Sequence, residues 1–247
     1  MNDRERGFLL LTSHLGDPER KVLTAAQLRA LALRVRERKP EAEGRELTEK
    51  DLTELDYSEE AARQIVTLLS QEPLLDDYLA RGEAWGCVPL TRVSPGYPLL
   101  LRQRLGLDSP GCLWAKGDLS ILNTPTLSLV GSRELREPNR AFARRVGELA
   151  AERGITLASG NARGADREAQ DACRKAGGRV ISIVADSLDK YPGRNRLFLS
   201  EEDFDEPFSA QRALSRNRCI HALGAMVLVA QADLHKGGTW SGTVKNL

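Results

Sequence analysis

Val130-Gly131-Ser132-Arg133 is a small-residue turn at the end of an apolar run, and Ser159-Gly160-Asn161-Ala162-Arg163-Gly164-Ala165-Asp166 is a second one. Each turn follows a predicted strand and precedes a predicted helix. Glycine and serine let the backbone approach a ligand closely, and the first turn of a helix carries free N–H groups. Because parallel strands end at the same edge of a sheet, two such turns on neighbouring strands predict one anion-binding crevice.

Each turn also holds an arginine, whose forked guanidinium suits a phosphate group. We therefore expect Arg133 and Arg163 to contact a nucleotide or the backbone of a nucleic acid. The alternative for Arg133 is a surface arginine that caps a loop. The alternative for Arg163 is a structural ion pair with Asp166 or Asp189.

Apolar runs alternate with helical patterns through the second half of the chain. We expect strands over residues 126–130, 155–158, 179–184 and 225–230, and helices over residues 139–152, 165–175 and 209–223. This alternation predicts a Rossmann-like α/β fold, with a doubly wound, mostly parallel sheet and helices on both faces. A last helix is expected to open within residues 237–243. A complete sheet of this kind would continue with at least one further strand. We expect either that the chain is truncated at its C-terminal end or that the missing strand comes from elsewhere.

The N-terminal part predicts a separate, all-helical domain over residues 1–84, before the Rossmann-like domain over residues 85–247. Helix-capping residues precede its apolar stripes: Thr24, Thr48 with Asp51 three residues later, and Ser58. We find no set of catalytic residues in this part.

The composition indicates a globular protein, with 41% hydrophobic and 29% charged residues. The formal net charge is only +1, but residues 129–247 carry 19 basic against 15 acidic residues. Four separated cysteines without a CxxC pair predict free thiols in a cytoplasmic protein. We expect no membrane partner, because no stretch approaches the about 18 apolar residues of a span and the N-terminal apolar run is too short for a signal peptide.

No group of residues predicts catalysis. The histidines His14, His221 and His235 are scattered and lack partners at the spacing of metal ligands. No Ser-His-Asp or Cys-His set can be assembled. We therefore expect no enzyme, no metal site and no cofactor.

Further polar residues follow the second turn. Arg216-Asn217-Arg218 lies in the second half of an expected helix. Residues two apart do not share a helix face, so we expect at most one of the arginines to contact a phosphate and the other to anchor an acidic residue such as Glu201. Ser241 and Thr243 lie at an expected helix start, where hydroxyl groups either cap the helix or bind an anion.

These motifs, in this order, resemble the DNA-processing protein A family (DprA, also called Smf) over residues 85–247. The matching residues are Gly96-Tyr97-Pro98-x-x-Leu101, Val130-Gly131-Ser132-Arg133, Ser159-Gly160-x-Ala162-Arg163-Gly164-x-Asp166, Gly177-Gly178, Leu188-Asp189-x-Tyr191-Pro192, Leu199-Ser200-Glu201, Arg216-Asn217-Arg218 and Ser241-Gly242-Thr243. The helical N-terminus resembles the family's sterile-alpha-motif-like domain. The resemblance implies single-stranded DNA binding without sequence preference, protection of incoming DNA in natural transformation and loading of a RecA-type recombinase. It also implies a homodimer and no catalysis.

The turns and the resemblance together indicate a set of DNA- or phosphate-binding residues: Gly131, Ser132, Arg133, Ser159, Gly160, Ala162, Arg163, Gly164, Arg212, Arg216, Asn217, Arg218, Ser241 and Thr243. The chain departs from the family pattern at several positions. Ala165 and Gln170 replace the usual isoleucine and histidine. Ala213 stands where the family has an aromatic residue that contacts a base, and Arg212 and Phe208 are the nearest substitutes.

The alternative is a Rossmann-like protein that handles free nucleotides, either a Lonely Guy-type phosphoribohydrolase or a nucleotide sensor of a defence system. Gly238-Thr239 and Gly242-Thr243 faintly resemble the glycine-rich motif of the hydrolases. That motif places a catalytic glutamate shortly after the threonine, whereas Val244, Lys245 and Asn246 follow here. The missing carboxylate argues against hydrolysis.

Overall fold

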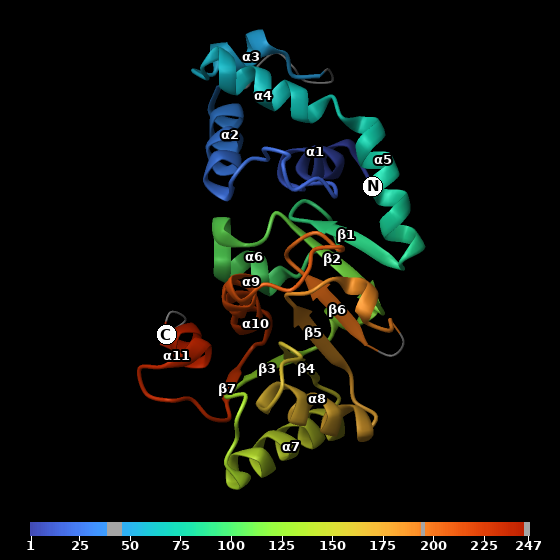
Figure 1. The fold of residues 1–247 in the computed structure, drawn as a ribbon, viewed down its shortest axis with the longest axis vertical. Helices are drawn as coiled ribbons and strands as arrows, with labels where there is room; N and C mark the ends of the chain where they lie inside the picture. Colours follow the sequence, from blue (N-terminus) through green and yellow to red (C-terminus); the bar gives the residue numbers. More distant parts are fainter. Residues whose placement is uncertain (39–45, 194–195, 245–247) are drawn as a thin grey trace.

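The computed structural model describes residues 1–38, 46–193 and 196–244 of the chain. In these ranges a seven-stranded sheet follows a helical N-terminal region (Figure 1). The strands lie in the order β1 (Cys87–Thr91), β2 (Cys112–Gly117), β6 (Leu197–Ser200), β5 (Val180–Val184), β4 (Thr156–Ser159), β3 (Thr126–Val130) and β7 (Val227–Val229). The five strands from β6 to β7 are parallel, and β1 and β2 form an antiparallel edge. The predicted Rossmann-like, mostly parallel α/β fold is confirmed.

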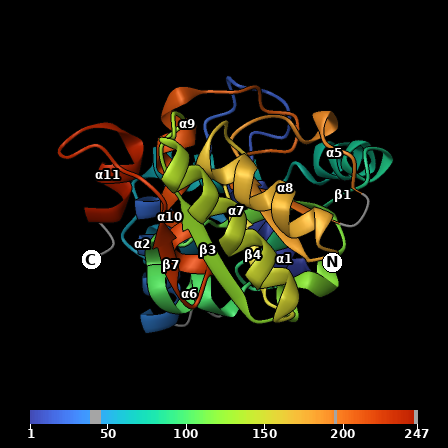
Figure 2. The ribbon, with the colours of Figure 1, turned by 90° about the horizontal axis from the view of Figure 1, so that it is seen from below.

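Helices cover both faces of the sheet, because side chains alternate along each strand and both sets are apolar. Ile181 and Ile183 of β5 pack into a core with α6 (Leu99–Leu105) and α10 (Asn217–Leu223). Val180, from the same strand, packs with α7 (Glu137–Glu152) and α8 (Ala165–Lys175). Figure 2 shows α7 and α8 lying across the sheet, with α11 (Gly237–Val244) set to one side next to α10.

The N-terminal helices pack in two groups. α2 (Ala25–Arg38), α3 (Glu49–Glu54) and α4 (Glu59–Leu69) share an apolar core with the end of α1 (Asp3–Thr12). α1 and α5 (Glu72–Ala84) also pack on the sheet, in a core that contains Trp114 and Phe198. The division of the chain into two domains at residue 84 stays a prediction. The capping residues Thr24, Thr48 and Ser58 all accept a backbone N–H as predicted.

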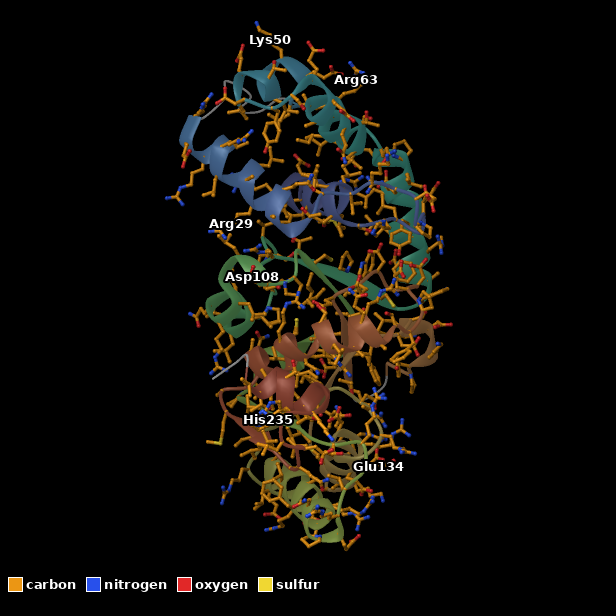
Figure 3. The ribbon with its side chains drawn as sticks, turned by 60° about the vertical axis from the view of Figure 1, so that its left-hand side comes forward. Arg29, Lys50, Arg63, Asp108, Glu134 and His235 are labelled. Atoms are coloured by element: carbon orange, nitrogen blue, oxygen red, sulfur yellow. The ribbon has the colours of Figure 1, made fainter. Side chains whose placement is uncertain are left out.

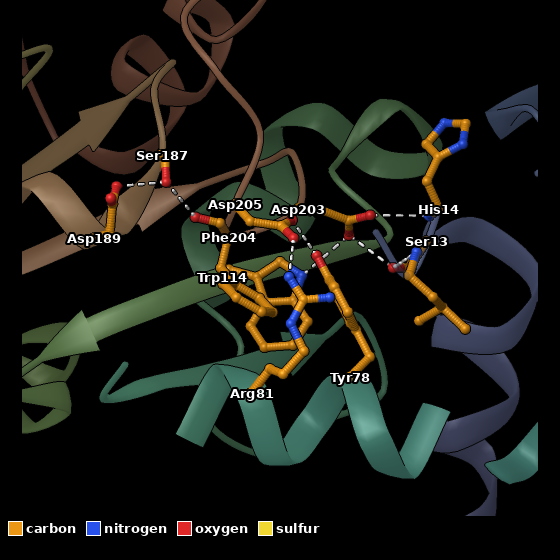
Figure 4. A network of polar contacts seen from close by, with 11 residues as sticks. Ser13, His14, Tyr78, Arg81, Trp114, Ser187, Asp189, Asp203, Phe204 and Asp205 are labelled. Atoms are coloured by element: carbon orange, nitrogen blue, oxygen red, sulfur yellow. Dashed lines mark hydrogen bonds and ion pairs between the residues drawn. The ribbon is translucent and has the colours of Figure 1, made fainter. Parts of the chain in front are cut away.

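A buried carboxylate ties the end of α1 to the sheet. Asp203, which follows β6, accepts hydrogen bonds from the Ser13 hydroxyl at 2.7 Å, the His14 amide at 2.9 Å and the Trp114 indole N–H at 3.3 Å (Figure 4). Burial raises the pKa of the Asp203 carboxyl, and the hydrogen bonds from these donors oppose that rise. The helical region and the sheet are therefore joined by polar contacts as well as by a shared core.

Some elements of the structure were not predicted individually, and one predicted helix is broken. The elements α1, α5 and β6 were not predicted individually. The single helix predicted over residues 209–223 is wrong, because the segment forms α9 (Ala210–Ser215) and α10, which meet at Arg216. Arg216 is buried, and its side chain is held by backbone carbonyl groups of the sheet, a tertiary constraint that no local pattern reveals.

Candidate nucleic-acid interface

The two predicted turns lie side by side at the carboxyl edge of the sheet. β3 and β4 are parallel neighbours, with Ser128 opposite Ala158. The amide of Ala165 donates a hydrogen bond to the carbonyl oxygen of Ser132, with 3.1 Å between nitrogen and oxygen. The expectation that the turns follow neighbouring parallel strands is therefore confirmed.

Two glycines allow the turns to pack against each other. Gly164 has a φ of +89°, and a Cβ at this position would lie 2.4 Å from the carbonyl oxygen of Ser132. A Cβ on Gly131 would lie 2.5 Å from the Cβ of Ala165. Because protein atoms fill this space, the close approach that these glycines permit is between the turns themselves.

The second turn already contains an anion of its own, the carboxylate of Asp166. This side chain is buried in the first turn of α8, and its Oδ2 accepts the amide of Ala162 at 3.3 Å. Burial raises the pKa of Asp166, whereas the Arg216 guanidinium and the Ala162 amide oppose the rise. Ser159 is buried as well, and its hydroxyl donates to the carbonyl of Leu129 at 2.6 Å. The Ala162 amide and the Ser159 hydroxyl therefore already have partners within the protein and are not left for an external anion.

Arg216 links the α9–α10 junction to the ends of two strands. Its guanidinium donates to the carbonyl oxygen of Gly160 at 2.7 Å and to that of Ile183. A Cβ on Gly160 would lie 2.6 Å from this guanidinium, so a larger residue at position 160 would clash with Arg216. The residue is 6% exposed, and burial lowers its pKa. A phosphate contact by Arg216 stays a prediction, and these intramolecular contacts do not favour it.

Two other predicted arginines have acidic partners. Arg218 forms an ion pair with Glu201 at 2.6 Å, so the predicted anchoring of Glu201 by one arginine of this segment is confirmed. Arg212 forms an ion pair with Glu206 at 2.5 Å and donates to the carbonyl of Pro207 at 2.7 Å. DNA contacts by Arg212 and Arg218 stay predictions.

A groove of about 920 Å³ runs along the two turns, and we call it the turn groove. Its walls are the two turns, the α9–α10 junction and the segment from residue 231 to the start of α11. Half of the predicted binding residues line it, namely Gly131, Ser132, Arg133, Ala162, Arg163, Arg216 and Asn217. The others do not line it, namely Ser159, Gly160, Gly164, Arg212, Arg218, Ser241 and Thr243.

Unpaired cations border the turn groove. Arg133, Arg136 and Lys236 are exposed, and none of them forms an ion pair within the ranges that the structure describes. Sequence reasoning missed Arg136 and Lys236. Arg136 comes just before Glu137-Pro138, a pattern typical of a helix start, and could have been found by that signal. Lys236 carries no such signal, because an irregular loop brings it to the groove.

The last helix differs from the prediction in its start. α11 begins at Gly237, so Ser241 and Thr243 lie inside the helix, and the expectation that they lie at its N-terminus is wrong. The hydroxyl of Thr243 donates to the carbonyl of Thr239 at 2.8 Å. Neither residue therefore presents free N–H groups to an anion.

No group of three or more His, Cys, Asp or Glu residues in the described ranges could hold a metal ion. None of the helices that the structure describes is both long and apolar enough to cross a lipid bilayer.

Comparison with known proteins gives one family. The model of the family described as DNA recombination-mediator protein A matches residues 89–244. Protein Smf of Escherichia coli (strain K12) is 34% identical over 142 residues, which are 53% of this chain and 38% of that protein. The DNA processing protein DprA of Streptococcus pneumoniae is 30% identical over 141 residues, 53% of this chain and 50% of that protein. The chain thus spans half or less of the length of these two curated relatives.

Two solved structures resemble the fold. DprA from Streptococcus pneumoniae superimposes with a TM-score of 0.70 at 22% identity, covering 91% of this chain and 83% of that chain. DprA from Helicobacter pylori, whose structure was described for its unique single-stranded DNA binding mode, gives a TM-score of 0.54 at 26% identity, covering 65% of this chain and 77% of that chain. The resemblance to the DprA family read from the motifs is confirmed.

Proposed function

The chain belongs to the DNA recombination-mediator protein A family, whose relatives are DNA-processing proteins, and on this premise we propose that it binds single-stranded DNA through the turn groove. The observation that carries the proposal is the placement of Arg133, Arg136 and Lys236 around a groove that the two turns form, with no ion pair to any residue that the structure describes. Phosphates are identical at every position of a strand, so contacts with them hold DNA without reading its sequence.

The Helicobacter pylori relative supports the choice of ligand, because its structure was described for single-stranded DNA binding and it is 26% identical to this chain. The turn groove suits a flexible strand better than a small nucleotide. Its cations stand on separate elements, the turn after β3, the start of α7 and the loop before α11, whereas a phosphate cradle would need convergent backbone amides. The amide of Ala162 faces Asp166 instead.

We further propose the family's wider role for this chain: protection of incoming DNA and loading of a RecA-type recombinase in natural transformation. The protein would act as a non-catalytic homodimer, and its free cysteines suit the reducing cytoplasm. A dimer would place two turn grooves on one strand and raise the apparent affinity. Light scattering at several concentrations tests the dimer, and RecA-dependent strand exchange with and without the protein tests the loading.

The decisive experiment is a fluorescence-anisotropy titration with labelled oligo-dT, repeated against AMP and NAD as competitors. We expect binding at low salt that weakens with a log–log slope of about −2 to −4, from a handful of phosphate contacts. Neither nucleotide should compete. Absent binding at low salt, or a flat salt dependence, would argue against DNA as the ligand. Displacement of the strand by AMP would favour the nucleotide-handling alternative.

A further inference from the structure

A second groove, of about 930 Å³, lies between α7 and α8, and we call it the helix groove. It shares Arg133, Glu134, Leu135 and Arg163 with the turn groove. The two grooves therefore meet at the two turns. An extended ligand that leaves the turn groove at this point enters the helix groove directly.

The carboxylates of the helix groove are compensated by neighbouring arginines. Glu168 pairs with both Arg140 and Arg144, the latter at 2.8 Å. Hydrogen bonds from these arginines lower the pKa of Glu168. Arg140 also pairs with Glu137 at 3.3 Å, so the two arginines and the two carboxylates of this cluster balance each other. The remaining acidic side chains have arginine partners too: Glu148 with Arg145, Asp171 with Arg174, and Glu134 with Arg163.

Basic side chains of the same groove are left without partners. Arg167 and Lys175 of α8 are exposed and form no ion pair in the described part of the chain. They are eight residues apart, about 12 Å along the helix axis, and both line the helix groove. Arg133 continues this series of cations at the junction with the turn groove.

We propose that the helix groove is a second binding segment for the phosphate backbone of the strand that occupies the turn groove. This inference rests on the proposed function and extends the site along α8. A protein partner fits less well, because the lining is mainly charged and offers little of the aromatic and aliphatic surface that anchors protein interfaces. A nucleic-acid backbone needs only spaced cations and an open groove.

The test compares two lengths of oligo-dT, of about 5 and about 15 nucleotides, within the range of site sizes of single-strand binding proteins. The variant is Arg167→Ala/Lys175→Ala, which removes two cations without leaving a carboxylate unpaired. The matched control is Arg29→Ala/Arg36→Ala on α2, which changes the net charge equally on another exposed helix. Figure 3 shows Arg29 and Glu134, a residue of both grooves, in opposite parts of the molecule.

We expect the groove variant to bind the short strand like the wild type and the long strand about tenfold more weakly at low salt, with a log–log salt slope smaller in magnitude by about 1.4, or about 0.7 for each lost contact. The control should bind both strands like the wild type. If the groove variant binds the long strand as tightly as the wild type does, the inference is overturned and the proposed function still stands. If the variant loses only binding to polyglutamate, the groove serves an acidic protein and the inference is wrong. If the wild type binds neither strand, both proposals fail.

Discussion

Arg163 donates a hydrogen bond to Glu134 with 3.2 Å between guanidinium nitrogen and carboxylate oxygen, and this pair joins the two turns where the turn groove and the helix groove meet. The side chains are 72% and 85% exposed. Exposed ion pairs of this kind contribute about 0–1 kcal/mol. A phosphate can therefore take the place of Glu134 at little cost, but the carboxylate competes with it.

Glu134→Gln should tighten the binding of oligo-dT. The change frees Arg163 and removes a negative charge from the path of the phosphates. We expect a gain of about 0.3–1 kcal/mol, or roughly two- to fivefold in Kd, measured by anisotropy at low salt. Glu60→Gln on α4 makes the same change in net charge far from the grooves and should have no effect. Weaker binding by Glu134→Gln would instead mean that Glu134 positions Arg163 for the ligand.

Arg133→Ala should weaken oligo-dT binding by about 1–2 kcal/mol, the scale of one charge-assisted hydrogen bond. The side chain is exposed and has no ion pair in the described ranges, so the free energy of unfolding should change by less than about 0.5 kcal/mol. Urea unfolding and anisotropy on the same preparation separate the two effects, with Arg29→Ala as the control. A variant that is less stable but keeps its affinity would assign Arg133 to the structure of the turn.

Gly164→Ala should destabilise the protein by about 3 kcal/mol or more. Its φ of +89° is unfavourable for alanine, and the new Cβ would meet the Ser132 carbonyl. Gly177→Ala is the matched control, because Gly177 has a φ of +78° with open space around its Cβ position. Gly177→Ala should lower the free energy of unfolding by only about 1 kcal/mol, which is the cost of the backbone conformation without a steric clash. Equal losses in urea unfolding would show that the turns can move apart without cost.

Asp203→Asn tests the junction of the N-terminal helices with the sheet. One oxygen of the Asp203 carboxylate accepts the His14 amide N–H. In the asparagine variant an NH₂ group placed there would face this N–H, donor against donor. We therefore expect the free energy of unfolding to fall by about 1–3 kcal/mol near pH 7. Burial raises the pKa of Asp203 above its unfolded value of about 3.9. This group therefore adds stability that is fully present below pH of about 3.9 and is lost as the pH rises through its folded pKa.

The difference in unfolding free energy between wild type and Asp203→Asn should consequently shrink as the pH rises from about 4 in a series of urea titrations. Other carboxylates titrate in the same range, but they are common to both proteins and cancel in the difference. A difference that grows with pH would mean that the donors around Asp203 outweigh its burial.

Local signals predicted much of the fold. β3 and α8 have the predicted bounds because an apolar run ends in small residues and a periodic pattern begins after Gly164. β6 has only four residues, all buried, and such a run does not differ from many buried segments. α1 was missed because its charged and apolar residues do not separate into a clear stripe.

The site was predictable where a turn carries its own cation, as at Arg133 and Arg163. Lys236 could not be found, because only the path of the loop before α11 brings it to the turn groove. Arg216 shows that a motif can also suggest a contact that the fold does not favour. Its position in the motif suggested a ligand contact, but tertiary packing directs its guanidinium to the carbonyls of Gly160 and Ile183.

Bases should contribute little to the affinity for DNA. Ala213 lines the turn groove at the position where the resemblance to the family predicts an aromatic residue, and neither Phe208 nor Arg212 lines that groove. Since each aromatic–base stack is worth about 1–3 kcal/mol, an abasic strand and an oligo-dT of equal length should bind within about 1 kcal/mol of each other. Phe208 is 56% exposed outside the groove, so Phe208→Ala should leave both affinities unchanged in anisotropy titrations. A loss above about 2 kcal/mol on removing the bases, reproduced by Phe208→Ala on intact DNA, would show that Phe208 reaches the strand and stacks on it.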